Sequence, residues 1–137
     1  MDKMVLSLPT GFVNDNRKDG WTLLEDVPLE GTPTLELAEF LKDGENGVNG
    51  ETMLSRAKEL GNLCGQHHAE RLLVLADHTP ESWRDFNFVF PGTVWLASGG
   101  DRVVPSLRRH GDGRWGFFWN WLGDDLRRNV RLVRLSK

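Results

Sequence analysis

The chain has 137 residues, of which 39% are hydrophobic and 27% are charged, and its formal net charge is -3. These values are typical of a folded globular protein and exclude a largely disordered chain. This length fits one domain, residues 1–137, and no apolar run approaches the roughly 20 residues that span a bilayer. The start, MDKMVLSLPTGF, lacks the pattern of a signal peptide, and the single cysteine, Cys64, cannot form an internal disulfide. We therefore expect a cytoplasmic protein that does not associate with membranes.

The first third of the chain contains few clear signals. We expect residues 1–33 to form an irregular segment, although its short apolar runs MVLSLP and WTLLEDVP are each compatible with a strand. The next stretch, GTPTLELAEFLKDG, predicts a helix, because Thr32 or Thr34 can cap it and Gly44 can end it. The loop KDGENGVNGE follows, with two Asn-Gly turn signals.

The clearest predicted helix covers residues 51–76, so residues 34–85 are expected to be mainly helical. Its apolar seam has helical spacing and consists of Met53, Ala57, Leu60, Cys64, His68 and Leu72. Gly61 and Gly65 lie beside this seam, and each costs about 1 kcal/mol in a helix interior relative to alanine. We therefore expect both glycines, with Ala57 and Cys64, to form a shallow groove that another element approaches closely.

From Phe86 onward the apolar pattern changes to a period of two residues, which is typical of strands. Turn sequences separate the runs FNFVF, TVWLA, RVVPSLRR, RWGFFWNWL and LRRNVRLVRL. Residues 86–137 therefore predict an antiparallel meander sheet of four to five strands. Pro105 cannot donate to a ladder, so we expect a bulge there or a ladder that starts late. The predicted fold class is α+β, with two or more helices packed on one face of the sheet.

The stretch GRWGFFWNWLG concentrates aromatic rings in one predicted strand. Alternation places Trp115, Phe117, Trp119 and Trp121 on one face, and Phe118 and Asn120 on the other. Four exposed rings would exceed the apolar patch that a monomer normally shows, so a helix, a partner subunit or a ligand must cover them. We expect them to dock on the small-residue groove, either as solid core or as the wall of an apolar, aromatic-lined cavity. The candidate pocket residues are Trp115, Phe117, Trp119, Trp121, Cys64 and His68.

No catalytic motif is evident in the sequence. His67 and Glu70 have the spacing of two helical metal ligands, but no third ligand is signalled, so we expect neither a metal nor another cofactor. Cys64 and His68 would share a helix face, yet a thiol in mid-helix lacks activation by a helix N-terminus. A nucleophile elbow, a phosphate loop and a dinucleotide fingerprint are all missing. We assign no catalytic residues and favour a protein that is not an enzyme.

Charge is distributed unevenly along the chain. Residues 1–99 carry 8 basic and 16 acidic residues, and residues 100–137 carry 9 and 4. The two parts can face and neutralise each other, which is the favoured interpretation. The alternative is a basic surface for an anionic partner, with Arg108, Arg109, Arg127 and Arg131 as candidates. The sequence pI of about 5.8 argues against nucleic acid as that partner.

The run FVFPGTVWLASGGDRVVPSL, with GRWGFFWNWLGDD and RLVRL after it, belongs to the last 50 residues. In FPGTVW and VPSL above all, it resembles small uncharacterised bacterial proteins of the integron mobile gene cassette type. The resemblance implies a small α+β protein, often oligomeric, and transfers no catalytic residues.

Three hypotheses follow from the sequence. The leading one is a non-enzymatic binding protein with an apolar cavity between the sheet and the main helix, which takes a small apolar or aromatic ligand. The alternatives are a homo-oligomeric interaction module, such as a homodimer, and a nucleic-acid-binding protein that uses its Arg-rich C-terminal strand.

Overall fold

The computed structural model describes residues 12–75 and 78–136. Its helices are α1 (Gly50–Leu60) and α2 (Gln66–Val74), with the short 3-10 helices η1 (Asn16–Asp19) and η3 (Glu81–Trp83). Its strands are β1 (Thr22–Glu25), β2 (Leu35–Ala38), β3 (Gly47–Asn49), β4 (Asn87–Val89), β5 (Val94–Leu96), β6 (Arg102–Arg109), β7 (Trp115–Trp121), β8 (Asp125–Arg127) and β9 (Val130–Leu135). The α+β class is confirmed. Among the described helices, none is both long enough and apolar enough to cross a membrane.

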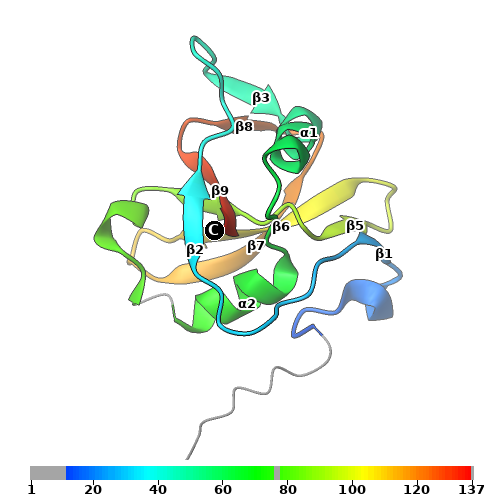
Figure 1. Cartoon of the computed structure of the whole chain (residues 1–137). Coiled ribbons are helices and arrows are strands. Elements are labelled where there is room, and N and C mark those ends of the chain that lie inside the picture. The colour runs from blue at the N-terminus through cyan, green and yellow to red at the C-terminus, as the bar shows by residue number, and fades with distance from the viewer. Residues whose placement is uncertain (1–11, 76–77, 137) are drawn as a thin grey trace, which may run out of the picture.

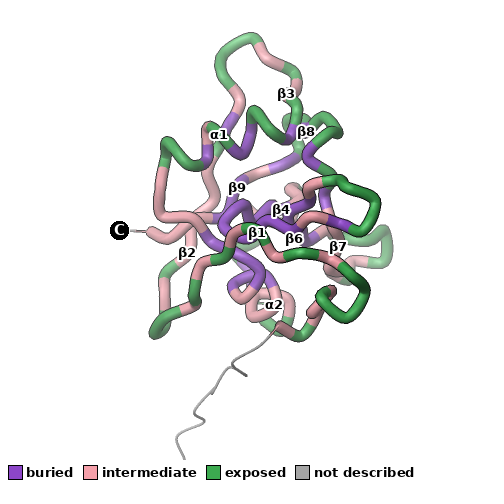
Figure 2. The backbone as a smooth tube through the Cα atoms, turned by 90° about the vertical axis from the view of Figure 1, so that its right-hand side faces the viewer, coloured by how far each residue is buried: buried purple, intermediate pink, exposed green. Residues whose placement is uncertain are grey.

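A curled, mixed sheet of seven strands forms the centre of the fold, in the order β1-β5-β6-β4-β9-β2, with β7 paired to β6 outside this order. Figure 1 shows α1 and the small β3–β8 sheet on one side of it and α2 on the other. The prediction that the helices share one face is therefore wrong. Two helices on opposite faces bury both surfaces of the central strands, which Figure 2 shows as the buried part of the tube.

Each face of the sheet has its own hydrophobic core, because neighbouring residues of a strand point to opposite faces. In β4, Val89 packs into the core beneath α1, and Phe88 packs into the core beneath α2. The same division separates Leu132 from Val133 in β9. We call these two clusters the α1-side core and the α2-side core.

The predicted meander is correct for β5, β6 and β7, which are antiparallel neighbours. It is wrong for β4 and β9, because β4 pairs with the same edge of β6 as β5 does, and β9 returns parallel to β4. Strands β1 and β2, from the first third of the chain, complete the sheet. Residues distant in sequence therefore build its edges, and local alternation carries no information on that pairing.

Pro105 lies within a continuous β6 and faces Trp119 of β7, so the expected bulge or late ladder is wrong. The carbonyl of Pro105 accepts a hydrogen bond from Phe90 N–H at 3.0 Å, on the edge of β6 that β5 and β4 share. On this edge the β5 pairing ends at Val103 and the β4 pairing begins at Ser106. The missing N–H therefore falls between two partner strands and leaves no ladder bond broken.

The helix predicted within residues 32–44 is wrong, because this segment forms β2, antiparallel to β9. Leu35 and Leu37 pack on the α2-side core, while Ala38 packs on the α1-side core. The segment LELA thus alternates with period two, and pairing with a strand almost a hundred residues away overrides its local helix signals.

The helix predicted over residues 51–76 is interrupted. Gly61 ends α1 with φ at +74°, Asn62 follows with φ at +56°, and α2 begins at Gln66. Leu63, between the helices, forms an isolated bridge with Arg134 of β9. The two glycines therefore mark a break in the helix, and the apolar seam is divided between two elements.

Candidate functional site

We call Trp115, Phe117, Trp119 and Trp121 the aromatic ladder. Its four rings lie on the face of β7 that alternation predicts, and three of them are partly buried. Trp115 stacks on Phe88 with ring centres 4.9 Å apart, and Phe117 packs against the same α2-side core. Trp119 lies 5.3 Å from Trp21, between ring centres, so the N-terminal segment covers it. Trp121, with 40% of its surface exposed, is the most accessible of the four.

The expected groove for these rings is wrong. A Cβ on Gly65 would meet Thr93 Oγ1, Val27 and Gly92, and a Cβ on Gly61 would meet no described atom within 4 Å. Cys64 does belong to the α2-side core, against which Trp115 and Phe117 also pack. Burial raises the pKa of its thiol to about 12, so Cys64 is a neutral core residue and supplies no thiolate.

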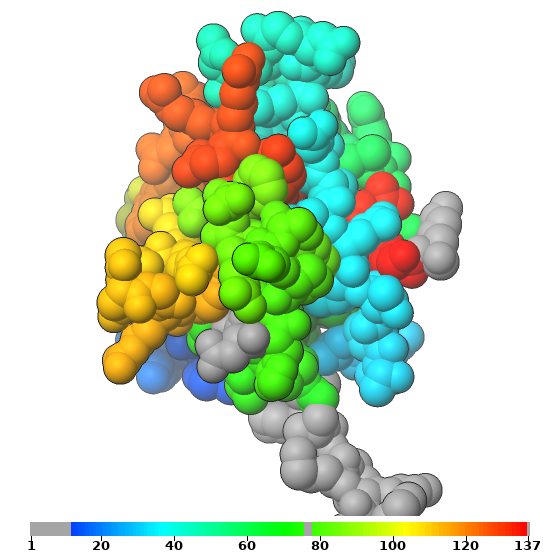
Figure 3. Space-filling view, turned by 90° about the vertical axis from the view of Figure 1, so that its left-hand side faces the viewer, coloured from blue at the N-terminus to red at the C-terminus, as the bar shows by residue number. Residues whose placement is uncertain are grey.

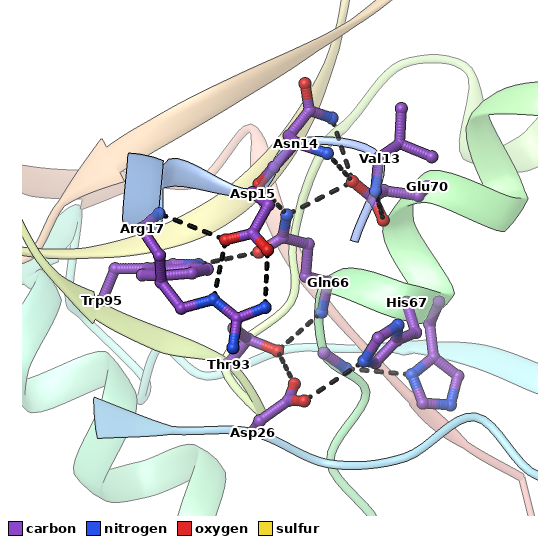
Figure 4. A network of polar contacts seen from close by, with 12 residues as sticks. Val13, Asn14, Asp15, Arg17, Asp26, Gln66, His67, Glu70, Thr93 and Trp95 are labelled. Carbon is purple, nitrogen blue, oxygen red and sulfur yellow. Dashed lines mark hydrogen bonds and ion pairs between the residues drawn. The ribbon is translucent and has the colours of Figure 1, made fainter. Parts of the chain in front are cut away.

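A buried polar network anchors the start of α2 (Figure 4). Gln66, fully buried, donates from its backbone N–H to Thr93 Oγ1 at 2.7 Å, and its side-chain Oε1 accepts from Trp95 Nε1 at 2.7 Å. Its Nε2 donates to the carbonyl of Asn14 at 2.7 Å. The carboxylate of Glu70 accepts from the backbone N–H groups of Val13 and Asn14. These bonds attach the segment before η1 to α2 and to β5.

Thr93, Asp26 and His67 form a chain of contacts that superficially resembles a catalytic triad. The hydroxyl of Thr93 donates to Asp26 Oδ1 at 2.7 Å, and His67 Nε2 lies 3.1 Å from Asp26 Oδ2. A triad requires the hydroxyl to face the imidazole. Here it faces the carboxylate, and Thr93 is fully buried. The arrangement is therefore suited to holding α2 against β5.

The residues with metal-ligand spacing are engaged separately, His67 with Asp26 and Glu70 with the backbone at Val13 and Asn14. Within residues 12–75 and 78–136, no group of three His, Cys, Asp or Glu side chains is arranged to hold a metal ion.

His68 lines a pocket of about 220 Å³ between α2 and the segment that leads into β2. Most of the lining is apolar, and its members are Leu29, Gly31, Thr32, Pro33, Leu35, His68, Arg71, Leu72 and Leu75. None of the four ladder rings is among these residues. The sequence predicts His68 in a pocket walled by the β7 rings, whereas the pocket that His68 lines is walled by the segment before β2.

The imidazole of His68 is held in one tautomer. Its Nδ1 accepts a hydrogen bond from Gly65 N–H at 3.0 Å, so in the neutral ring the proton is on Nε2. Burial, and next the charge of His67, lower the pKa of His68 to about 4, which keeps the ring neutral at physiological pH. Nε2–H has no hydrogen-bond partner among the described residues, and His68 is only 2% exposed. The pocket lining therefore includes a neutral imidazole with its proton on Nε2.

The four candidate basic residues are divided among three pockets. Arg108 and Arg127 line one on the α1 side of the sheet, Arg109 lines a second, and Arg131 lines a third. Arg131 Nη2 also lies 3.2 Å from Glu39 Oε1, which neutralises part of the positive charge of the C-terminal strand.

Comparison of the chain with models of known protein families, with curated proteins and with solved structures gives no match. The resemblance to integron cassette proteins therefore stays a prediction, and the functional inference depends on the geometry of the pockets.

Proposed function

We propose that this protein is a non-enzymatic binding protein for a small apolar molecule that carries a carboxylate or another hydrogen-bond acceptor. The observation that carries the proposal is the N–H donor of His68 in a mostly apolar pocket, with no partner among the described residues. Ligand pockets typically combine apolar walls with a few polar groups that orient the ligand. A ligand acceptor that pairs with this N–H would contribute binding free energy.

The lining of the His68 pocket favours an apolar body with an acceptor group. Leu29, Pro33, Leu35 and Leu72 supply the walls. Arg71 also borders the pocket and has no carboxylate within ion-pair distance in the described part of the chain. A volume of about 220 Å³ suits a ligand smaller than a typical drug molecule. A short carboxylic acid has this shape and charge.

The chemistry of the nearby groups supports binding over catalysis. A neutral imidazole with a proton on Nε2 presents a donor to the pocket and accepts no proton there. The thiol of Cys64, whose pKa is raised to about 12, is not a nucleophile at neutral pH.

Titration calorimetry with hexanoate and with 1-hexanol tests this proposal. We expect hexanoate to bind, and we expect Leu72→Trp to abolish binding because the larger side chain fills the pocket. The matched control is Val74→Trp on the same helix, since Val74 is 80% exposed and lies outside the pocket lining. The variant His68→Asn keeps an acceptor for Gly65 N–H but has no N–H at the position of Nε2, because its side chain is shorter, and it should weaken binding about tenfold. Absence of binding, or equal binding to Leu72→Trp, would contradict the proposal.

Self-association is a second candidate function, supported by a different part of the fold. Among the described strands β7 pairs only with β6, and Trp121 at the end of β7 is 40% exposed. An unpaired strand edge beside an exposed ring is a surface on which a second copy can add a strand. Sedimentation equilibrium at high micromolar concentration should then show a dimer that Trp121→Lys weakens, whereas a monomer at that concentration would exclude this function.

A further inference from the structure

A second pocket lies on the α1 side of the sheet, away from His68. Its volume is about 260 Å³, and it is bordered by β6, β7 and the segment from Asp124 to Val130. Figure 3 shows the space-filling surface where the yellow and orange residues of β6 and β7 adjoin the orange-red residues of β8 and β9. Its polar side chains include Asn87, Ser106, Arg108, Asn120, Arg127 and Asn129. We call it the Ser106 pocket.

Ser106 is the residue that most clearly indicates a ligand. Its side chain is 1% exposed, and Oγ has no hydrogen-bond partner among the described residues. Buried hydroxyl groups are almost always hydrogen-bonded, because an unpaired one retains a desolvation penalty. Ser106 is among the residues that line the pocket, so a ligand that reaches this hydroxyl would supply the missing partner.

Arg108 and Asn120 extend this donor set. Arg108 Nη2 donates to Asn120 Oδ1 at 2.8 Å, which directs the amide oxygen to the guanidinium and leaves the amide N–H groups free of any described acceptor. The guanidinium of Arg108 lies over the Phe118 ring at 5.4 Å, which restricts its orientation. No described carboxylate lies within 4.0 Å of Arg108. A planar guanidinium without a counter-ion, next to hydroxyl and amide donors, is suited to a carboxylate.

The other charges of the pocket limit the net charge of the ligand. Arg127, Asp124 and Asp125 are exposed at its border, and neither carboxylate forms an ion pair with a described residue. Together with Arg108 they give a lining of balanced charge. A dianion such as a phosphate monoester would meet like charge at the aspartates, whereas a zwitterion would find a partner for each of its groups.

We infer that the Ser106 pocket binds a small zwitterion of the α-amino-acid class. The carboxylate of the ligand takes the donors of Ser106, Arg108 and Asn120, and its ammonium group faces Asp124 and Asp125. This site is independent of the proposed function, because it lies on the opposite side of the sheet and shares no lining residue with the His68 pocket.

The test is calorimetric titration of the purified full chain with each common amino acid at millimolar concentration, followed by the deaminated and decarboxylated analogues of any binder. We expect at least one amino acid to bind and both analogues to bind more weakly. Arg108→Met should weaken binding about ten- to a hundredfold, the range for hydrogen bonds to a charged group. Arg114→Gln is the matched control, because the side chain of Arg114 is 86% exposed and outside the pocket lining.

Ser106→Ala distinguishes a ligand-binding hydroxyl from a structural one. Because Ser106 Oγ has no described partner, its removal should leave the thermal midpoint of the free protein unchanged or raised, while affinity for the amino acid falls. The inference is overturned if no amino acid binds, if the deaminated analogue binds equally well, or if Arg108→Met and Ser106→Ala both bind as the parent does. Leu72→Trp should not affect this binding, so failure of the His68 proposal is recognised separately.

Discussion

Acidification from pH 7 to pH 4.5 should lower the free energy of unfolding by about 2 to 3 kcal/mol through His68 alone. In the folded protein, burial lowers the pKa of His68 to about 4 from an ordinary value of 6.5, with a smaller contribution from the charge of His67. Between these two values the unfolded chain binds a proton that the folded chain does not. Stability is therefore fully present above pH 6.5 and is lost as pH falls toward 4.

Urea unfolding at a series of pH values measures this effect, and His68→Asn is the control. The variant retains an acceptor for Gly65 N–H but has no group that titrates in this range. The pH range of these measurements ends at 4.5 so that Glu45 does not contribute. Arg56 lowers the pKa of Glu45 to about 2, so the stability that comes from this carboxylate is lost only as pH falls below 4.5. The difference in the free energy of unfolding between the parent protein and His68→Asn should decrease as pH falls. Parallel curves for the two proteins would show that His68 does not titrate as described.

Gly50→Ala should destabilise the fold by about 3 kcal/mol, at the upper end of the usual overpacking penalty. A Cβ on Gly50 would lie 2.7 Å from Leu122 Cα and 2.8 Å from the Leu122 carbonyl oxygen, and backbone atoms cannot rotate away as a side chain can. The required shift also disturbs the hydrogen bonds from Gly50 N–H to the Asp124 carbonyl and from Glu51 N–H to the Leu122 carbonyl. These bonds attach the start of α1 to the end of β7.

Chemical denaturation of Gly50→Ala beside Gly123→Ala measures this contact. Gly123 lies between Leu122 and Asp124, in the loop that Gly50 contacts. A Cβ on Gly123 would meet no described atom within 4 Å, and the φ of Gly123 is not positive. We expect the control to stay within about 0.5 kcal/mol of the parent. If both variants were equally stable, the close approach of α1 to this loop would be disproved.

The aromatic strand β7 shows which structural features a local sequence pattern predicts and which it does not. Alternation correctly placed Trp115, Phe117, Trp119 and Trp121 on one face, because a strand inverts its side chains at every residue whatever lies around it. The covering elements were only partly predictable. Trp21, from the first third of the chain, covers Trp119, and nothing in the local sequence of either residue encodes that contact.

The residues of the His68 pocket were likewise only partly predictable from the sequence. Its position on an apolar seam indicated that His68 is buried, and it is. Sequence reasoning missed Leu29, Pro33 and Leu35, because it interpreted residues 32–44 as a helix. The one available signal was the period-two segment LELA, which favours a strand and would have moved this segment to a sheet edge.

The sequence by itself determined the α+β class, the strand character of much of residues 86–137 and the face on which the four rings of β7 lie. These properties follow from side-chain periodicity, which depends on backbone geometry within a few residues. Only the tertiary structure decided that α1 and α2 lie on opposite faces, that β2 pairs with β9, and that Ser106 and His68 each belong to the lining of a pocket. Those outcomes depend on contacts between segments far apart in the chain, where packing and backbone pairing outweigh local preference.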